Sequence, residues 1–154
     1  MDFRLRWPTQ YGVITQQFLE RPGYYSRFTY TGVDGRSYRM PGHEGVDLMA
    51  PTGSEVYACA DGMVSDVRLD GNSMPYGNQV RIQHQGGYET IYAHLSQVHV
   101  QKNQAVQAGQ RIGLAGETGN AEGAHLHLAL KKQGATQAGE TVFKNDFIDP
   151  TPLL

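Results

Sequence analysis

The chain has 154 residues, a formal net charge of -2 at pH 7, 19 glycines and a single cysteine. This length suits one domain with an adequate core, and the small net charge gives no reason to expect a nucleic acid or an anionic membrane as partner. The lone Cys59 excludes an internal disulfide, and no apolar run reaches the roughly 18 residues of a membrane span.

The N-terminal part of the chain predicts a first strand at 12–18, followed by a polar, aromatic-rich segment from Glu20 to Met40. Glycines punctuate that segment, so we expect a long loop or arm. The first residues lack the apolar region of a secretory signal. We therefore expect either a trimmed chain or a phage-type protein that reaches its site by another route.

Strand patterns fill the middle of the chain. We expect strands at 55–60, 62–69, 78–84 and 88–95, with a short hairpin connection at 85–87. Between Val100 and Gly116 apolar residues alternate with glycines, which is typical of short strands in a tight β fold. No window of about 11 residues or more has a helical period. We predict an all-β fold with little helix: a compact antiparallel sheet or sandwich with a barrel-sandwich-hybrid-like core (a duplicated hybrid motif).

The most informative stretch is His125-Leu126-His127, which continues as Leu128-Ala129-Leu130. In a strand, alternate side chains point to opposite faces. The leucines then face a core, while both histidines share the other face about 6.6 Å apart along the strand. At that spacing one imidazole can bind a metal while the other reaches a water or substrate beside it.

A second cluster lies in Pro41-Gly42-His43-Glu44-Gly45-Val46-Asp47. Its proline and glycines favour a turn that leads into a strand, rather than a helix. His43-Glu44 begins like the H-E-x-x-H metalloprotease motif, but position 47 is Asp and the required helix is not expected. We therefore expect Glu44 to be a solvated acidic side chain rather than a general base.

Zinc chemistry accounts for these polar residues together. Catalytic zinc usually takes three protein ligands and leaves a fourth position open. His43, Asp47 and one member of the His125/His127 pair can form such a trio, which leaves one net positive charge to acidify water and polarise a carbonyl. Without a glutamate base, a further histidine must move the proton, and His94 is a candidate on a face shared with Tyr92. By contrast, we expect His84 and His99 to have structural roles only. Cys59 lies in an apolar run, and we do not expect it to act as a nucleophile.

In this order, the pieces resemble a known family. His43-x-x-x-Asp47, Tyr92-Ala93-His94-Leu95 and the stretch from Gly119 to His127 are similar to the three signatures of lysostaphin-type (LytM-like) zinc endopeptidases. The connecting segments 50–64, 76–78 and 113–119 are also similar to its strands and turns. The resemblance covers Trp7 to Leu154 and is strongest from Gly42 to Leu130.

The resemblance implies one Zn²⁺ per chain, held by His43, Asp47 and His127. His94 and His125 are then the catalytic pair that does not bind the metal. It further implies a single peptidase domain over 1–154, with an N-terminal strand and arm at 1–40, a catalytic core at 41–130 and a C-terminal tail at 131–154. An oxyanion-stabilising tyrosine often precedes the first ligand in this family, and Tyr38 and Tyr30 are the candidates.

The implied function is zinc-dependent hydrolysis of peptide cross-links or stem peptides in bacterial peptidoglycan. We accordingly expect a hydrolase that acts outside the cytoplasm, in the cell wall or periplasm, as a monomer. One alternative is a non-catalytic LytM-like regulator or wall-binding module, although such relatives usually lose ligands. Another is a biotinyl, lipoyl or phosphoryl carrier, but no exposed Met-Lys-Met-like turn appears and a phosphocarrier would not need Asp47. Bound zinc would separate these alternatives.

Overall fold

The computed structural model describes residues 3–119, 121 and 123–154, so Asn120 and Glu122 of the third motif lie outside the described residues. The predicted all-β class is confirmed: over the described ranges every strand pairing is antiparallel, in one ten-stranded and one two-stranded sheet. Helix is confined to α1 (Pro22–Tyr25), η1 (Gln85–Gly87) and η2 (Thr151–Leu153). None of the helices in this part of the chain is long and apolar enough to cross a membrane. The barrel-sandwich-hybrid arrangement stays a prediction.

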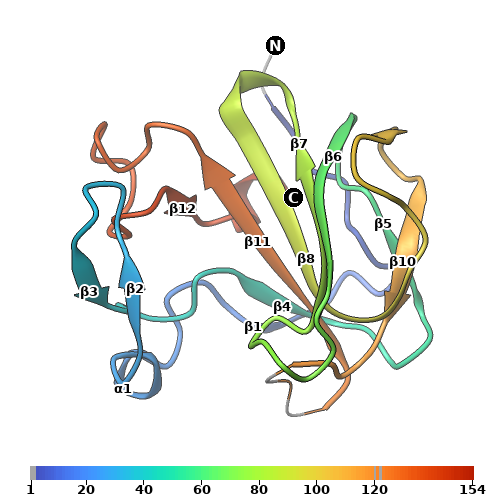
Figure 1. Cartoon of the computed structure of the whole chain (residues 1–154), viewed down its shortest axis with the longest axis horizontal. Coiled ribbons are helices and arrows are strands. Elements are labelled where there is room, and N and C mark those ends of the chain that lie inside the picture. Colours follow the sequence, from blue (N-terminus) through green and yellow to red (C-terminus); the bar gives the residue numbers. More distant parts are fainter. Residues whose placement is uncertain (1–2, 120, 122) are drawn as a thin grey trace.

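The larger sheet forms the body of the molecule (Figure 1). Its continuous order is β1 (Ile14–Gln16), β4 (Val46–Met49), β11 (His125–Lys132), β8 (Tyr88–Val98), β7 (Asn78–Gln83), β6 (Gly62–Leu69) and β9 (Ala105–Val106). Three strands lie off this path. β10 (Arg111–Ala115) pairs with both β8 and β5 (Glu55–Tyr57), and β12 (Phe147–Ile148) pairs with β11.

The core lies on both sides of β11. As the alternation predicts, Leu126, Leu128 and Leu130 are fully buried in the main cluster. Burying each such side chain contributes about 1.5–3 kcal/mol, so this face anchors the strand. On the other face, Ala129 packs in a second cluster with Phe143 and Phe147. The two histidines of β11 are therefore presented by a strand that is fixed from both sides.

The register of the three central strands places residues from distant parts of the sequence side by side. His127 of β11 pairs with Asp47 of β4 on one side and with Ala93 of β8 on the other. His94 follows Ala93 with a left-handed backbone (φ 62°), which breaks the strand alternation. The expected shared face of Tyr92 and His94 is therefore wrong: Tyr92 is buried in the main core, whereas His94 lines a pocket.

The segment from 20 to 40 is more structured than the loop expected from its composition. After α1 it forms a hairpin of β2 (Thr29–Thr31) and β3 (Ser37–Arg39), which is the separate two-stranded sheet. Figure 1 shows α1 and this hairpin at one side of the larger sheet. The hairpin is attached to the C-terminal segment, because the Val33 N–H donates to the Lys144 carbonyl at 2.7 Å and the Lys144 N–H donates to the Tyr30 hydroxyl at 2.8 Å. We call 19–40 the arm.

Candidate metal centre

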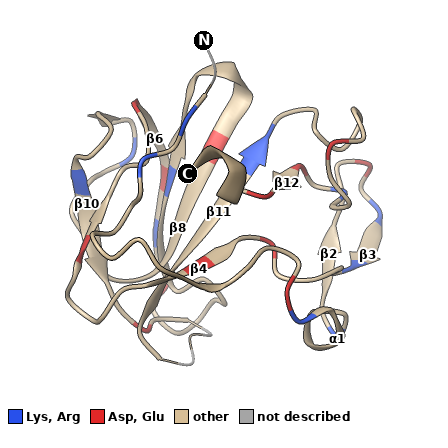
Figure 2. Cartoon of the chain, turned by 180° about the vertical axis from the view of Figure 1, so that it is seen from behind, with Lys and Arg blue, Asp and Glu red and all other residues tan. Residues whose placement is uncertain are grey.

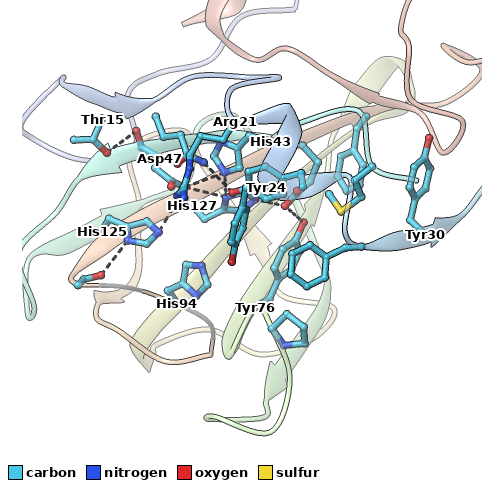
Figure 3. Close-up of a pocket in the computed structure, with 18 of the residues that line it drawn as sticks. Thr15, Arg21, Tyr24, Tyr30, His43, Asp47, Tyr76, His94, His125 and His127 are labelled. Carbon is cyan, nitrogen blue, oxygen red and sulfur yellow. Dashed lines mark hydrogen bonds and ion pairs between the residues drawn. The ribbon is translucent and has the colours of Figure 1, made fainter. Parts of the chain in front are cut away.

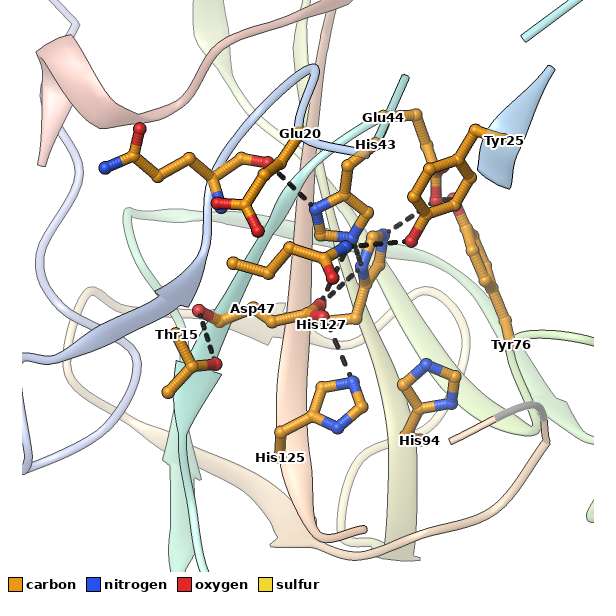
Figure 4. Close-up of polar contacts among 12 residues, drawn as sticks. Thr15, Glu20, Tyr25, His43, Glu44, Asp47, Tyr76, His94, His125 and His127 are labelled. Atoms are coloured by element: carbon orange, nitrogen blue, oxygen red, sulfur yellow. Dashed lines mark hydrogen bonds and ion pairs between the residues drawn. The ribbon is translucent and has the colours of Figure 1, made fainter. Parts of the chain in front are cut away.

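Three side-chain atoms from two parts of the chain converge on one point. His43 Nε2 lies 3.1 Å from His127 Nδ1 and 3.3 Å from Asp47 Oδ1, and the last two atoms are 3.0 Å apart (Figure 4). Nitrogen and oxygen ligands about 2.1 Å from a tetrahedral zinc would be separated by about 3.4 Å, so the observed triangle, only slightly smaller, fits one such ion. These are the three residues that the resemblance implied as metal ligands.

The outward-facing ring nitrogens indicate which tautomers are present. His43 Nδ1 donates to the Gln17 carbonyl at 3.2 Å, so its Nε2 lone pair points at the triangle. His127 Nε2 lies 3.0 Å from the Glu44 carboxylate, an ion-pair contact without the alignment of a good hydrogen bond, and this leaves Nδ1 facing inward. A cation that replaces the inward-facing proton of His127 would therefore meet two imidazole nitrogens and a carboxylate oxygen together.

Two glycines allow the turn before β4 to approach its neighbours. A Cβ on Gly42 would lie 2.6 Å from Leu19 Cα, and one on Gly45 would collide with the Leu128 carbonyl oxygen and lie 3.1 Å from His127 Cε1. Because glycine lacks a Cβ, the chain passes close to the arm on one side and to β11 on the other. The turn predicted from Pro41 and its glycines thus holds His43 next to His127.

Glu44 differs from its sequence expectation. We expected a solvated side chain, yet Glu44 is only 8% exposed. Its carboxylate accepts a hydrogen bond from the Tyr76 hydroxyl at 2.9 Å and contacts His127 on the other side. Burial favours the protonated acid, but the His127 imidazole outweighs it and lowers the pKa of Glu44 to about 2. The ionised Glu44 is therefore a partner of the candidate ligand rather than a surface charge.

Charge is concentrated at the centre of the triangle. Burial disfavours a charged His127 ring, but the Glu44 and Asp47 carboxylates outweigh this and raise its pKa to about 10. Burial likewise acts against an ionised Asp47, yet the two neighbouring imidazoles lower the pKa of this carboxyl well below its usual range. Both effects mean that the centre is built to hold positive charge.

His94 and His125 lie together beside the triangle. Their ring centroids are 4.9 Å apart, and His125 Nε2 is 3.5 Å from Asp47 Oδ1. Each Nδ1 donates to a backbone carbonyl, of Thr118 at 2.6 Å for His94 and of Gly123 at 3.0 Å for His125. Burial lowers the pKa of His94 to about 4, so its ring is neutral near pH 7. Both rings can present a basic Nε2.

These residues lie in a pocket of about 700 Å³ that the arm helps to enclose (Figure 3). Tyr25 of α1 stacks on the His43 ring with centroids 5.4 Å apart, and Gln16 donates to its hydroxyl oxygen at 2.8 Å. Tyr30 also lines the pocket, whereas Tyr38 is not among the lining residues and hydrogen-bonds Asp34. Sequence reasoning missed Tyr25, and nothing in its local pattern marks it.

The remaining candidates lie elsewhere. His84 is buried and bonds the Asp61 carbonyl and Thr90, while His99 contacts Gln97 at the surface. Burial raises the pKa of the Cys59 thiol to about 12, which leaves it unreactive. None of the three is a pocket-lining residue, in line with the ordinary roles expected of them.

Curated proteins of similar sequence match about three fifths of this chain. Peptidoglycan DD-endopeptidase ShyA of Vibrio cholerae is 46% identical over 97 residues, which cover 62% of this chain and 22% of that protein. DD-carboxypeptidase/endopeptidase Mpg of Neisseria meningitidis is 42% identical over 92 residues, covering 60% of this chain and 20% of the relative. The chain thus spans only about a fifth of the length of these curated relatives.

Solved structures extend the similarity to nearly the whole chain. A mutant of the catalytic domain of the prophage-encoded M23 protein EnpA from Enterococcus faecalis has a TM-score of 0.70 at 25% identity, covering 97% of this chain and 95% of that one. A zinc-containing peptidase from Vibrio cholerae has a TM-score of 0.64 at 35% identity, covering 84% and 36% respectively. The model of peptidase family M23 matches residues 41–139, more than half of the sequence. The chain belongs to peptidase family M23.

Proposed function

We propose that this protein is a zinc-dependent endopeptidase that hydrolyses peptide bonds in the cross-links or stem peptides of bacterial peptidoglycan. The observation that carries the proposal is the convergence of His43 Nε2, Asp47 Oδ1 and His127 Nδ1 within 3.0–3.3 Å of one another. Family membership and the names of the most similar relatives support the substrate class. The site of action is then the cell wall or periplasm.

His43, Asp47 and His127 hold one Zn²⁺ in this proposal. A zinc ion with an open position lowers the pKa of water to about 7 and polarises a carbonyl as a Lewis acid. Two neutral imidazoles and one carboxylate leave one net positive charge for that task. Glu44 positions His127, since a carboxylate on the outer nitrogen fixes the tautomer and makes the inner nitrogen a better donor.

His94 and His125 move protons. One imidazole accepts the proton of the attacking water at Nε2, and the other supports the developing charge or protonates the leaving amine. Their backbone hydrogen bonds at Nδ1 leave the Nε2 atom of each neutral ring as the proton acceptor. The strained φ of His94 is consistent with such a role, because left-handed backbone at a non-glycine residue is retained where the surroundings fix it.

Tyr25 is our candidate for the oxyanion-stabilising tyrosine, in place of Tyr30 and Tyr38. Its hydroxyl oxygen accepts the Gln16 amide hydrogen, so its own O–H stays available as a donor. Its ring stacks on His43 and thereby lies next to the metal centre, whereas the Tyr30 ring packs against Phe143. The Tyr38 hydroxyl is excluded because it donates to the Asp34 carboxylate. A donor at this place can hold the charged oxygen of the tetrahedral intermediate.

A non-catalytic regulator or wall-binding module remains the second candidate, but no feature of the site favours it. Such relatives lose ligands, whereas all five polar positions are present here and meet in one pocket. A monomeric state stays a prediction, as does the division into an N-terminal strand and arm at 1–40, a catalytic core at 41–130 and a C-terminal tail at 131–154.

Digestion of purified peptidoglycans with different cross-link chemistry tests the proposal. The zinc-loaded protein is incubated with each, with and without a chelator, and mass analysis identifies the bonds cut. We expect cleavage of at least one cross-link type that chelation abolishes, and none with His125→Ala. Zinc bound without cleavage of any peptidoglycan would overturn the endopeptidase proposal in favour of the binding module.

A further inference from the structure

We propose that Arg21 recognises a carboxylate on the bound peptide, so that the pocket prefers acidic peptides with a free carboxyl group over the same peptides in amidated form. This inference rests on the proposed endopeptidase function and deepens it by naming a chemical feature of the substrate.

The position of Arg21 is fixed relative to the metal centre. The Leu19 N–H donates to the His43 carbonyl at 2.8 Å, and the His43 N–H donates to the Glu20 carbonyl at 3.1 Å. These two backbone hydrogen bonds tie Leu19 and Glu20 to His43, and Arg21 is the next residue in the chain. Leu19 and Arg21 both have left-handed φ values, of 66° and 55°. Strain of this kind at non-glycine residues is a reason to look for a function.

The Arg21 side chain is exposed and lines the pocket. Arg21 Cζ lies 4.5 Å from the centroid of the Tyr24 ring, which supports the flat face of the cation. Figure 3 shows Arg21 and Tyr24 on the side of the pocket where His43 lies. Within the described ranges no ion pair joins Arg21 to a carboxylate, whereas Arg68, Arg81 and Arg111 each have one.

The pocket offers an anion no other Lys or Arg. Among the described residues that line it, Arg21 alone belongs to these types. Glu44 and Asp47, the acidic residues among the described lining residues, are already engaged with imidazoles. Figure 2 shows basic positions beside α1, apart from those of the larger sheet. A planar guanidinium with exposed N–H edges is the side chain best suited to a bidentate contact with a carboxylate.

Stacking on Tyr24 does not by itself explain Arg21. Arg27 also places its Cζ 4.5 Å from the same ring and in addition donates from Nε to the Tyr24 carbonyl at 3.2 Å. Arg27, however, is not a pocket-lining residue. The two arginines therefore share a packing partner but differ in access to the substrate, which makes Arg27 a matched control.

The test compares two synthetic stem-peptide dimers that are identical except that one carries free carboxylates and the other carboxamides. Using the zinc-loaded full chain, kcat/KM is measured for both substrates with wild type, Arg21→Gln, Arg21→Lys and Arg27→Gln. We expect wild type to prefer the acidic dimer about tenfold, and Arg21→Gln to lose that preference through KM, with kcat/KM for the amidated dimer changed less than about twofold. Arg27→Gln should keep the full preference. Arg21→Lys should keep part of it, because lysine retains the positive charge but lacks the planar guanidinium that makes a bidentate contact.

Three results would count against the inference, and they differ in what they mean. Equal loss on both substrates in Arg21→Gln would assign Arg21 a structural role. Equal cleavage of both dimers by wild type would exclude carboxylate recognition while leaving the endopeptidase proposal intact. Cleavage of neither dimer by wild type, with zinc bound, would instead overturn the proposed function itself.

Discussion

His127 and Asp47 face each other directly across the β11–β4 ladder, and their side chains meet with Nδ1 and Oδ1 3.0 Å apart. Backbone pairing therefore determines the spacing of two of the three candidate ligands. His43 joins them from the turn just before β4, four residues upstream of Asp47. The centre is thus preorganised by the sheet.

Replacing His127 and His125 one at a time should separate two roles. His127→Ala removes one of the three inward-facing donor atoms, so we expect loss of both bound zinc and activity. His125→Ala leaves the triangle complete, so zinc should remain bound while turnover falls at least about a hundredfold. Metal analysis of the purified variants, combined with a cleavage assay, checks both. Full turnover by His125→Ala would show that the roles are wrongly assigned.

Glu44→Gln should weaken zinc binding without unfolding the protein. The variant keeps the size of the side chain but removes the negative charge beside His127 Nε2, and losing such an outer partner typically costs 10- to 100-fold (about 1.4–2.8 kcal/mol) in metal affinity. Competition with a chromophoric chelator measures the change. Tyr76→Phe, which removes only the hydrogen bond to Glu44, should have a smaller effect. If Glu44→Gln bound zinc as tightly as wild type, Glu44 would have no positioning role.

Removal of the metal should abolish activity and leave the β structure in place. The strands that carry Asp47 and His127 are paired through their backbones, so the far-ultraviolet circular dichroism should not change on chelation. The melting temperature should fall, because a ligand at a hundredfold excess over its Kd stabilises the folded state by about 2.7 kcal/mol. Added zinc should restore activity. A loss of β signal on chelation would mean that the metal is needed for folding.

Gly45→Ala should destabilise the protein, because its new methyl group would collide with the Leu128 carbonyl oxygen on a strand packed from both sides. Overpacking of this kind costs about 1–3 kcal/mol, and zinc affinity should fall as well since His127 Cε1 is also close. Gly23→Ala is the matched control: a Cβ there meets no heavy atom within 4 Å, so its free energy of unfolding should change by less than about 0.5 kcal/mol. Denaturant melts of the two variants compare them directly, and equal stability of both would contradict the packing argument.

His84 should make the fold sensitive to mild acid. Burial lowers the pKa of His84 below its ordinary value of 6.5. A group with a depressed folded-state pKa binds protons more readily when unfolded, so the stability it preserves above about pH 6.5 is lost as the pH falls further. Unfolding free energies of wild type and His84→Gln, measured from pH 7.5 to 5, should therefore converge toward acid pH. A difference that stays constant over this range would show that the titration of His84 does not contribute.

Local patterns predicted much of the sheet. The strand expected at 62–69 is observed with the same bounds as β6, and the leucines of β11 are buried as their alternation required. In these places each residue's role depends on near neighbours in sequence and on burial of one face. The strand expected at 12–18 is shorter in the structure, where β1 covers only Ile14–Gln16 and its pairing with β4 contains a register shift.

The site was harder to predict where it depends on contacts between distant segments. Glu44 is buried because Tyr76 and His127 surround it, and neither is near it in sequence. His94 leaves the strand face expected from alternation because its backbone is left-handed, a conformation that only a few per cent of non-glycine residues adopt. Tyr25 and Arg21 lie at the pocket because a backbone hydrogen bond joins Leu19 to His43. No local sequence pattern predicts that contact.

The arm is built separately from the sheet that carries the candidate ligands. Its hairpin forms a sheet of its own, and beside the metal centre its backbone bonds to the turn before β4 through Leu19 and Glu20. The candidate ligands thus belong to the sheet and the turn before it, whereas Arg21, the proposed substrate contact, belongs to the arm. Exchanging residues of 20–40 other than Tyr25, while retaining Gly42 and the Leu19 contact, is accordingly a route to redirect this scaffold toward new peptides without redesigning its reactive centre.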